Sequence, residues 1–241
     1  MKSIIAATAI IASAFCGILP AQDASPDMLT PEGHPKLRWT FLKTDINVDG
    51  VEISIPAPGE KLAPADETSL KQMGVDIPED SRLLCAVLPE DDETAFKMGS
   101  DHAIGKYYLV MAPKDPDDTK MGPHDFSNIV AKIKNGMNGK TYGMMRNLLG
   151  DVTPGTVREL GEPLVMGSVF GGKDVHAACV LVYGEKGSLK ACYATISAVM
   201  EVKKRLIFVN YSSKFESMAD IDELVDEMKA WTVSISESNK D

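Results

Sequence analysis

Hydrophobic and polar residues alternate in several segments of this chain, which is the pattern of β-strands that bury one face. Such alternation in residues 37–42 and 51–55, on either side of a turn at 47–50, predicts a first hairpin. A continuous apolar run at 82–88 suits a central strand, and residues 107–112 are expected to lie beside it. The first half of the chain is therefore expected to contribute several strands to a sheet.

The second half contains three longer strand-like runs, at 175–183, 189–200 and 205–211. Short turn-like segments separate them, so we expect an antiparallel meander. Before the meander, residues 136–172 hold nine of the 19 glycines of the chain. Because glycine favours turns and loops, this stretch is expected to be the least regular part of the protein.

Apolar residues at helical spacing predict two helices in the first part of the chain. Residues 66–73 form the first, which Gly74 is expected to close. Asp125 is expected to cap the second, which ends at 135–136. The apolar positions of this second helix are Phe126, Ile129, Val130 and Ile133.

A closing helix is predicted near the C-terminus, where Asp220 and Glu223 are read as a capping box. One face of this helix is acidic, and Glu227 on that face is expected to contribute little to stability. The other face is apolar and is expected to pack on the sheet through Ile221, Leu224, Val225, Met228 and Trp231.

Strands interspersed with helices indicate an α+β fold, an antiparallel sheet covered by helices in an α/β/α sandwich. The chain has 241 residues, of which 44% are hydrophobic, enough to build one core. We expect a single domain over residues 37–236 and a tail at 237–241.

The N-terminus has the composition of a secretory signal, with Lys2 before an uncharged apolar stretch. We expect a signal peptide at 1–21, cleaved after Ala21, and a flexible leader at 22–36. Cleavage after Ala14 and lipidation of Cys16 are the alternatives. The protein is therefore expected to be exported, periplasmic or secreted, with no membrane span in its mature form.

The net charge of −10 disfavours partners that carry many phosphates. A nucleic-acid partner and an anionic membrane surface are therefore not expected. A protein or small-molecule partner remains open.

Two cysteines lie on the first two strands of the meander. If residues 185–186 form the loop, Cys179 and Cys192 face each other directly and could form a disulfide in an oxidising compartment. A register shifted by one residue would put them on opposite faces. The alternative is that both are reduced and buried.

Known chemical motifs are matched only in part. Residues 45–50 copy the first half of an EF-hand calcium loop, but Pro56 occupies the position of the last carboxylate. In residues 167–171, Ser168 follows Gly167 directly, so the segment is not a nucleophile elbow. We expect no metal, no cofactor and no recognisable catalytic motif.

Three residues are the candidates for a site. His124 and Asp125 lie near Asp115, Asp117 and Asp118 and could hold a cation, although an acidic loop with a helix cap is the favoured interpretation. His176 begins a hydrophobic strand and is either a half-buried strand residue, which we favour, or part of a site.

Three features follow one another along the chain: a Val-Glu-Ile-Ser-Ile-Pro strand at 51–56, the meander that ends at Tyr211 and the helix that ends at Trp231. This order of elements resembles the PsbP/Mog1/DcrB-like family, best over residues 189–235. The resemblance implies an α/β/α sandwich and an accessory, assembly or interaction role in place of catalysis. An exported binding protein is thus the favoured class, and a hydrolase whose site assembles only in the fold is the alternative.

Overall fold

The computed structural model describes residues 43–98, 104–186 and 189–240. The expected signal peptide, the leader and the strand at 37–42 lie outside these residues. A hairpin is present about the predicted turn, but β2 (Val51–Pro56) pairs with β1 (Lys43–Val48) and not with the predicted strand at 37–42. Asn47 stabilises the turn by accepting a bond from Gly50 N–H.

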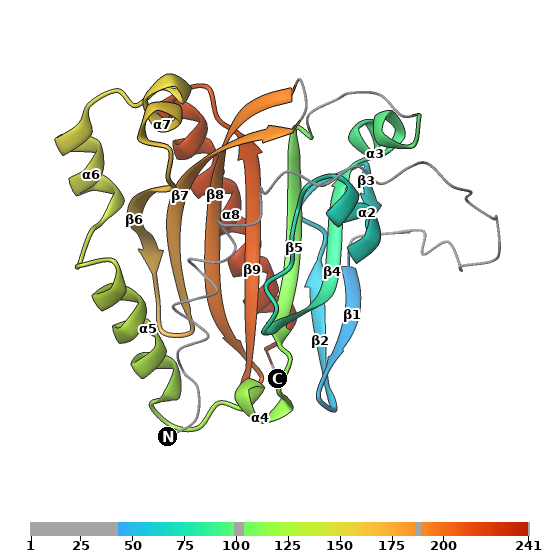
Figure 1. Ribbon diagram of the computed structural model, residues 1–241. Coiled ribbons are helices and arrows are strands. Elements are labelled where there is room, and N and C mark those ends of the chain that lie inside the picture. The colour runs from blue at the N-terminus through green and yellow to red at the C-terminus, as the bar shows by residue number, and fades with distance from the viewer. Residues whose placement is uncertain (1–42, 99–103, 187–188, 241) are drawn as a thin grey trace.

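The main sheet of the described residues has seven strands, and all neighbouring pairs in it are antiparallel (Figure 1). The predicted pairing of the run at 82–88 with the run at 107–112 and the predicted meander are both confirmed. In spatial order the strands are β3 (Leu62–Pro64), β4 (Ser81–Pro89), β5 (Lys106–Pro113), β9 (Arg205–Lys214), β8 (Leu189–Val202), β7 (Val175–Lys186) and β6 (Leu164–Gly171).

One face of this sheet is covered by α8 (Met218–Ser238) and by the β1–β2 hairpin. Alternate residues of the meander point toward this layer and form the largest core cluster, as strand periodicity requires. The predicted apolar face of the closing helix enters this cluster through Ile221, Leu224, Met228 and Trp231, with Val225 packed at its edge.

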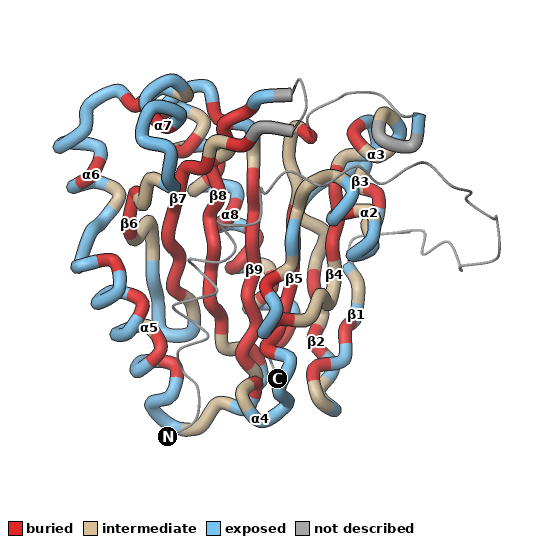
Figure 2. Tube along the Cα trace, viewed as in Figure 1, coloured by how far each residue is buried: buried red, intermediate tan, exposed pale blue. Residues whose placement is uncertain are grey.

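Helices α2 (Glu67–Gln72) and α5 (Asp125–Gly136) pack on the opposite face of the sheet. Phe126, Ile129 and Ile133 of α5 belong to one buried cluster with Phe208 and Val199 of the sheet. Because both faces are covered, strands β7 to β9 are buried along most of their length (Figure 2). The α+β architecture with helices on both faces is as predicted.

The glycine-rich stretch is more regular than predicted. It forms α6 (Tyr142–Leu149), α7 (Pro154–Leu160) and the edge strand β6. Threonines at 141 and 153 cap the two helices, and Gly161 ends α7 in the left-handed conformation at φ 67°. The glycines of this stretch therefore lie mainly at helix ends and at close backbone contacts, and they do not form one long loop. The remaining short helices are α3 (Glu90–Lys97) and α4 (Pro116–Thr119).

The ends of α8 differ from the predicted ones. Ser217 is the N-cap and Asp220 is the third helical residue, whose carboxylate accepts from Ser217 N–H at 2.7 Å, so the predicted box with Glu223 was displaced by one turn. At the other end, α8 continues to Ser238, so its last two residues lie in the expected tail. Asn239 is buried and its side-chain amide donates to Ser54 O at 2.7 Å, which fastens the end of α8 to the hairpin.

The predicted facing of Cys179 and Cys192 is wrong. In the actual register Cys179 pairs with Ile196 and Cys192 pairs with Tyr183, four residues further along β7. Four residues of strand span about 13 Å, which is beyond the reach of a disulfide. Both cysteines are free and buried on the same face of the sheet, which is the alternative of a reduced core pair.

Within the described ranges, we find no helix with the length and hydrophobicity needed to cross a membrane.

Candidate functional site

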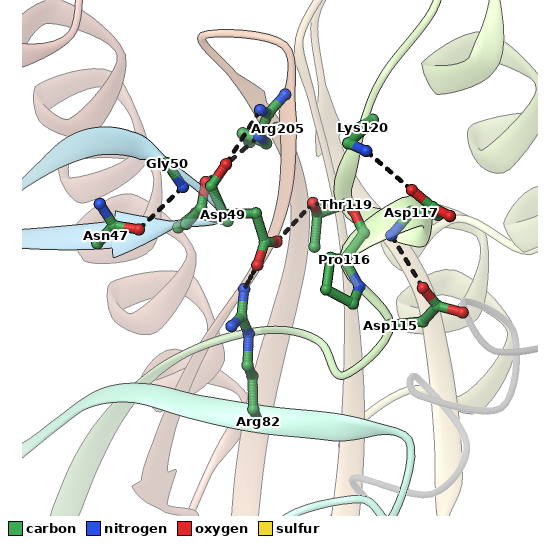
Figure 3. Close-up of polar contacts among 11 residues, drawn as sticks. Asn47, Asp49, Gly50, Arg82, Asp115, Pro116, Asp117, Thr119, Lys120 and Arg205 are labelled. Carbon is green, nitrogen blue, oxygen red and sulfur yellow. Dashed lines mark hydrogen bonds and ion pairs between the residues drawn. The ribbon is translucent and has the colours of Figure 1, made fainter.

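The loop at residues 45–50, which copies the first half of an EF-hand loop, connects the β1–β2 hairpin to the main sheet and to α4 (Figure 3). Asp49 accepts from Arg82 Nη2 and from Thr119 Oγ1, each at 2.7 Å, and its own carbonyl accepts from Arg205 Nη2 at 3.3 Å. Burial opposes ionisation of this carboxyl, but the bonds from Thr119 and Arg82 outweigh it, so the pKa of Asp49 is lowered. The loop therefore anchors the hairpin to β4, α4 and β9.

The His124–Asp125 loop is exposed and serves as a helix start. His124 is the N-cap of α5 with a left-handed backbone at φ 73°, so Asp125 is the first helical residue and not the predicted cap. The Asp125 carboxylate accepts from Gly122 N–H at 2.8 Å. Asp115 caps α4, and Asp117 pairs with Lys120 at 2.8 Å. In the part of the chain that the structure describes, no three His, Cys, Asp or Glu side chains are grouped as a metal site would require.

His176 lies elsewhere, in the wall of a cavity of about 710 Å³ between the C-terminal half of α5, the start of α6 and strands β6 and β7. We call this cavity the His176 pocket. Neither His124 nor Asp125 lines it, so the fold does not bring the three candidate residues together. The lining residues are Val130, Lys134, Gly139, Thr141, Tyr142, Gly143, Ser168, Val169, Phe170, Gly171, Gly172 and His176.

The imidazole of His176 is 3% exposed, so the expectation of a half-buried strand residue understated its burial. Its Nε2 lies 3.3 Å from Ser168 Oγ on the neighbouring strand. Burial, aided by the charge of Lys134, lowers the pKa of His176 to about 4. The ring is therefore neutral near pH 7, with one nitrogen able to donate and the other able to accept.

The backbone of β6 shapes the pocket. Its pairing with β7 shifts register between Val165 and Gly167 and again between Ser168 and Phe170. Gly167 has φ 88°, and a Cβ on it would lie 2.5 Å from Lys140 O. Ser168 N–H donates to that same carbonyl at 3.0 Å. A residue without a side chain is thus required where the loop before α6 meets β6, and this contact places the start of α6 beside Ser168.

Only part of this site could be predicted from the sequence. His176 was singled out, but Ser168 was set aside because its spacing does not match a nucleophile elbow. Lys134 lies on the helix that was predicted correctly, yet nothing in its periodicity distinguishes it from other exposed lysines. The two register shifts that bring Ser168 to His176 are a property of strand pairing, which no local pattern encodes.

The comparisons with known proteins are sparse. No family model matches the chain, and no curated protein sequence matches it. Two similar solved structures are the Ran-binding protein Mog1p of Saccharomyces cerevisiae and LpqN of Mycobacterium tuberculosis, which is described as involved in cell envelope biogenesis. Mog1p is 9% identical over 82% of this chain and 92% of its own, with a TM-score of 0.33. LpqN is 9% identical over 64% of this chain and 75% of its own, with a TM-score of 0.27.

Neither likeness, at those TM-scores, bears on what this chain binds. Membership of the PsbP/Mog1/DcrB-like family stays a prediction from the order of elements.

Proposed function

We propose that this chain is an exported, non-enzymatic binding protein and that a small molecule occupies its His176 pocket. The observation that carries the proposal is the pocket itself, a cavity of about 710 Å³ with a buried imidazole in its wall. Cavities of this size, with apolar walls and a few convergent polar groups, are typical of small-molecule sites. Val130, Val169 and Phe170 supply the apolar walls here.

Binding is favoured over hydrolysis by the composition of the lining. A serine nucleophile needs a base, and the base in turn is oriented by a third group, which is a carboxylate in most hydrolases. Ser168 and His176 are paired, but the twelve lining residues include no Asp or Glu. Nothing in the lining would stabilise the imidazolium that forms when histidine takes the serine proton.

Export is the part of the proposal that rests on the sequence alone. The basic start and the apolar stretch within residues 1–21 support a cleaved signal. Exported proteins of this kind meet ligands outside the cytoplasm, so nucleotide-driven reactions are not part of the proposal.

The experiment is a fragment screen followed through the backbone amide spectrum of the ¹⁵N-labelled protein. We expect bound fragments to shift the amide signals of Gly143, Gly171 and Ser168. Gly143 lines the pocket and a Cβ on it meets no atom within 4 Å, so the ring of Gly143→Phe should occupy the pocket and abolish the shifts of Gly171 and Ser168.

The matched control is Gly155→Phe. Gly155 is likewise the second residue of a short helix, and a Cβ there makes only ordinary contact with Thr153 Oγ1 at 3.5 Å, but it does not line the pocket. Shifts that persist in Gly143→Phe, or that vanish in both variants, would contradict the proposal.

A hydrolase is the second candidate, because Ser168 Oγ lies 3.3 Å from His176 Nε2. A fluorophosphonate probe separates the two functions, since it labels activated serines covalently. We expect no labelling of the wild-type protein. Stoichiometric labelling that is lost in Ser168→Ala and in His176→Asn would establish the hydrolase instead.

A further inference from the structure

Part of the sheet face between α2 and α5 is buried without an apolar layer over it among the described residues. Val180 and Val182 of β7 are 0% and 8% exposed, yet the apolar side chain that packs against them is Val165 of the neighbouring strand. The cluster under α5 reaches Val199 and the cluster under α2 reaches Leu109, but neither includes the two valines. The described helices therefore account for only part of the burial on this face.

Polar side chains beside the two valines are buried as well. Ser197 of β8 lies opposite Asn210 of β9, and these residues are 4% and 3% exposed. Strand alternation directs Ser197 to the same face as Val199. Thr195 and Ser212 in the next row pair with each other at 2.7 Å, but Ser197 Oγ and Asn210 Oδ1 have no hydrogen-bond partner in the described part of the chain. Buried acceptors without a donor cost free energy, so this face lacks N–H or O–H donors.

An extended polypeptide segment supplies both groups that this face lacks. Its backbone N–H groups are donors, and its side chains alternate in direction, so that apolar groups can lie on one side. Residues 37–42, Leu-Arg-Trp-Thr-Phe-Leu, alternate in this way and continue directly into β1 at Lys43. The N-terminal part of this same chain therefore has the chemistry that the face requires.

This part of the chain is also long enough to reach the face. The bond from Arg82 to Asp49 holds the β1–β2 hairpin beside β4. Four strand spacings of about 4.8 Å, roughly 19 Å, separate β4 from β7 in the sheet. After cleavage at the expected site, residues 22–42 precede β1, and this segment spans up to about 70 Å when extended. It can pass around the edge of the sheet and still cross the meander.

We propose that residues 22–42, which we call the N-terminal segment, cover the sheet between α2 and α5 within the same molecule. Its apolar side chains contact Val180 and Val182, and its backbone N–H groups donate to Ser197 Oγ and Asn210 Oδ1. The inference goes beyond the proposed function and does not depend on it, because none of these four residues lines the His176 pocket. The expected leader is then part of the fold and not a free extension.

A nitroxide spin label on the N-terminal segment of the ¹⁵N-labelled full chain tests this arrangement. Thr30→Cys and Thr40→Cys carry the label in turn, in a Cys16→Ser background. The other three cysteines, Cys85, Cys179 and Cys192, have thiols whose pKa burial raises, so they should stay unlabelled.

We expect at least one of the two labels to broaden the amide signals of Val180, Val182 and Ser197. The signal of Val233, which is 53% exposed on α8 in the opposite layer, should keep its intensity. The control label is at Lys240→Cys, an exposed position next to Asn239, which is bonded to Ser54 of the hairpin. It should leave the signals of the face unchanged.

Val182→Lys and Val233→Lys are the matched variants. Both replace a valine by lysine, but only Val182 belongs to the buried face. Val182→Lys should displace the N-terminal segment and restore the Val180 and Ser197 signals, whereas Val233→Lys should leave them broadened. Ser197→Ala, which removes one hydroxyl and keeps the fold intact, should weaken docking of the segment about fivefold, the equivalent of one neutral hydrogen bond.

The contrary results concern the place and the source of the segment. If neither label broadens the face signals, if Val233 broadens equally, or if Val182→Lys and Ser197→Ala both leave the broadening unchanged, the inference is overturned. Spin-labelled ¹⁴N protein mixed with unlabelled ¹⁵N protein should cause no broadening. Broadening in that mixture would show that a second copy covers the face and would also overturn the inference. The proposed binding function stands under each of these results.

Discussion

Ser168 Oγ on the edge strand β6 and His176 Nε2 on its neighbour β7 lie 3.3 Å apart, at the wall of a cavity that the start of α6 also lines. The pair depends on the glycine at 167, whose left-handed backbone lets β6 approach Lys140 O closely. The backbone of the edge strand β6 therefore determines that Ser168 lies next to His176 in the wall of the pocket. Because the His176 ring is buried, it takes up a proton at a different pH in the folded and the unfolded protein.

The first prediction concerns stability as a function of pH. Burial and Lys134 lower the pKa of His176 to about 4 in the folded protein, whereas an unfolded histidine titrates near 6.5. As pH falls from about 6.5 to about 4, the unfolded state gains a proton that the folded state does not. The contribution of His176 to the free energy of unfolding is therefore complete above pH 6.5. It decreases by about 3 kcal/mol in total as the pH falls to about 4.

Urea titrations at pH 7.5, 5.5 and 4.5 measure this effect. His176→Asn should show a shallower loss of stability between these values than the wild type. His124→Asn is the control, since His124 is exposed and asparagine tolerates its left-handed backbone. A wild-type slope that persists in His176→Asn would show that other groups cause the pH dependence.

The second prediction concerns the Asp49 anchor. In Asp49→Asn the carboxylate that receives Arg82 and Thr119 is lost, while the left-handed backbone at φ 49° is still tolerated. The Asp49 side chain is 12% exposed and that of Arg82 is 33% exposed, so the substitution would leave a partly buried guanidinium without its carboxylate. We expect a loss of about 2 to 3 kcal/mol in the free energy of unfolding. Asp45→Asn, an exposed carboxylate on the same hairpin that accepts from Ser54, should cost less than half as much.

The third prediction concerns Trp231 on α8. The indole is 5% exposed, donates to Pro56 O at 2.8 Å and meets the ring of Tyr108 edge-on at 5.5 Å between centroids. Trp231→Ala should therefore destabilise the fold by about 3 to 5 kcal/mol, measured by denaturant titration. An unchanged midpoint would contradict a core role for this helix face.

The helical pattern indicated Glu227→Ala as the control for the Trp231→Ala titration, but the structure favours another residue. Glu227 was expected to be inert because it falls on the acidic face, but its carboxylate accepts from the hydroxyl of Tyr211. Burial and this bond raise the pKa of Tyr211. Glu223→Ala, at an exposed position, is the better control and should change stability by less than about 0.5 kcal/mol.

Hydrophobic periodicity predicted most of the fold because one face of each long element is buried. The meander, the run at 82–88 with its partner and the apolar face of α8 all follow from it. The cysteine register failed because a hairpin can close at several loop positions, and only the full ladder shows that Cys179 pairs with Ile196. The prediction that the glycine-rich stretch is irregular failed because glycine is used at helix ends and close backbone contacts as well as in loops.

The candidate site was harder to predict than the fold. His176 was recognised because a histidine in an apolar run is unusual, but its partners come from segments that are distant or irregular. Lys134 is brought to it by the packing of α5, and the start of α6 is brought to it by the contact of Gly167 with Lys140. Such contacts depend on tertiary packing, so no spacing in the chain indicates them.

The fourth prediction concerns the thiols of the described residues. Burial raises the pKa of Cys85 and of Cys192 to about 12 and raises that of Cys179 as well. Because the thiolate is the reactive form, iodoacetamide at pH 8 should leave all three unmodified in the folded protein. In denaturant without reductant all three should react, which mass spectrometry detects. A Cys179–Cys192 pair that reacts only after reduction would contradict the register.

The fifth prediction concerns export. Expressed from residue 1 in a secreting host, the protein should be recovered with Gln22 as its first residue, since Ala21 offers the small side chain that signal peptidase requires. Intact mass measures this directly. A start at Phe15 would move the cleavage to Ala14, and a diacylglycerol adduct on Cys16 would make the protein a lipoprotein.

The most direct test of the central claim is a crystal structure of the protein soaked in a fragment that shifts the amide signals of the pocket, which serves as the probe. The account predicts density for the probe in the His176 pocket, with its apolar part against Val169 and Phe170. The same soak of Gly143→Phe should leave the pocket without the probe. Density for the probe only on other surfaces, with the pocket of the wild type holding solvent alone, would contradict the account.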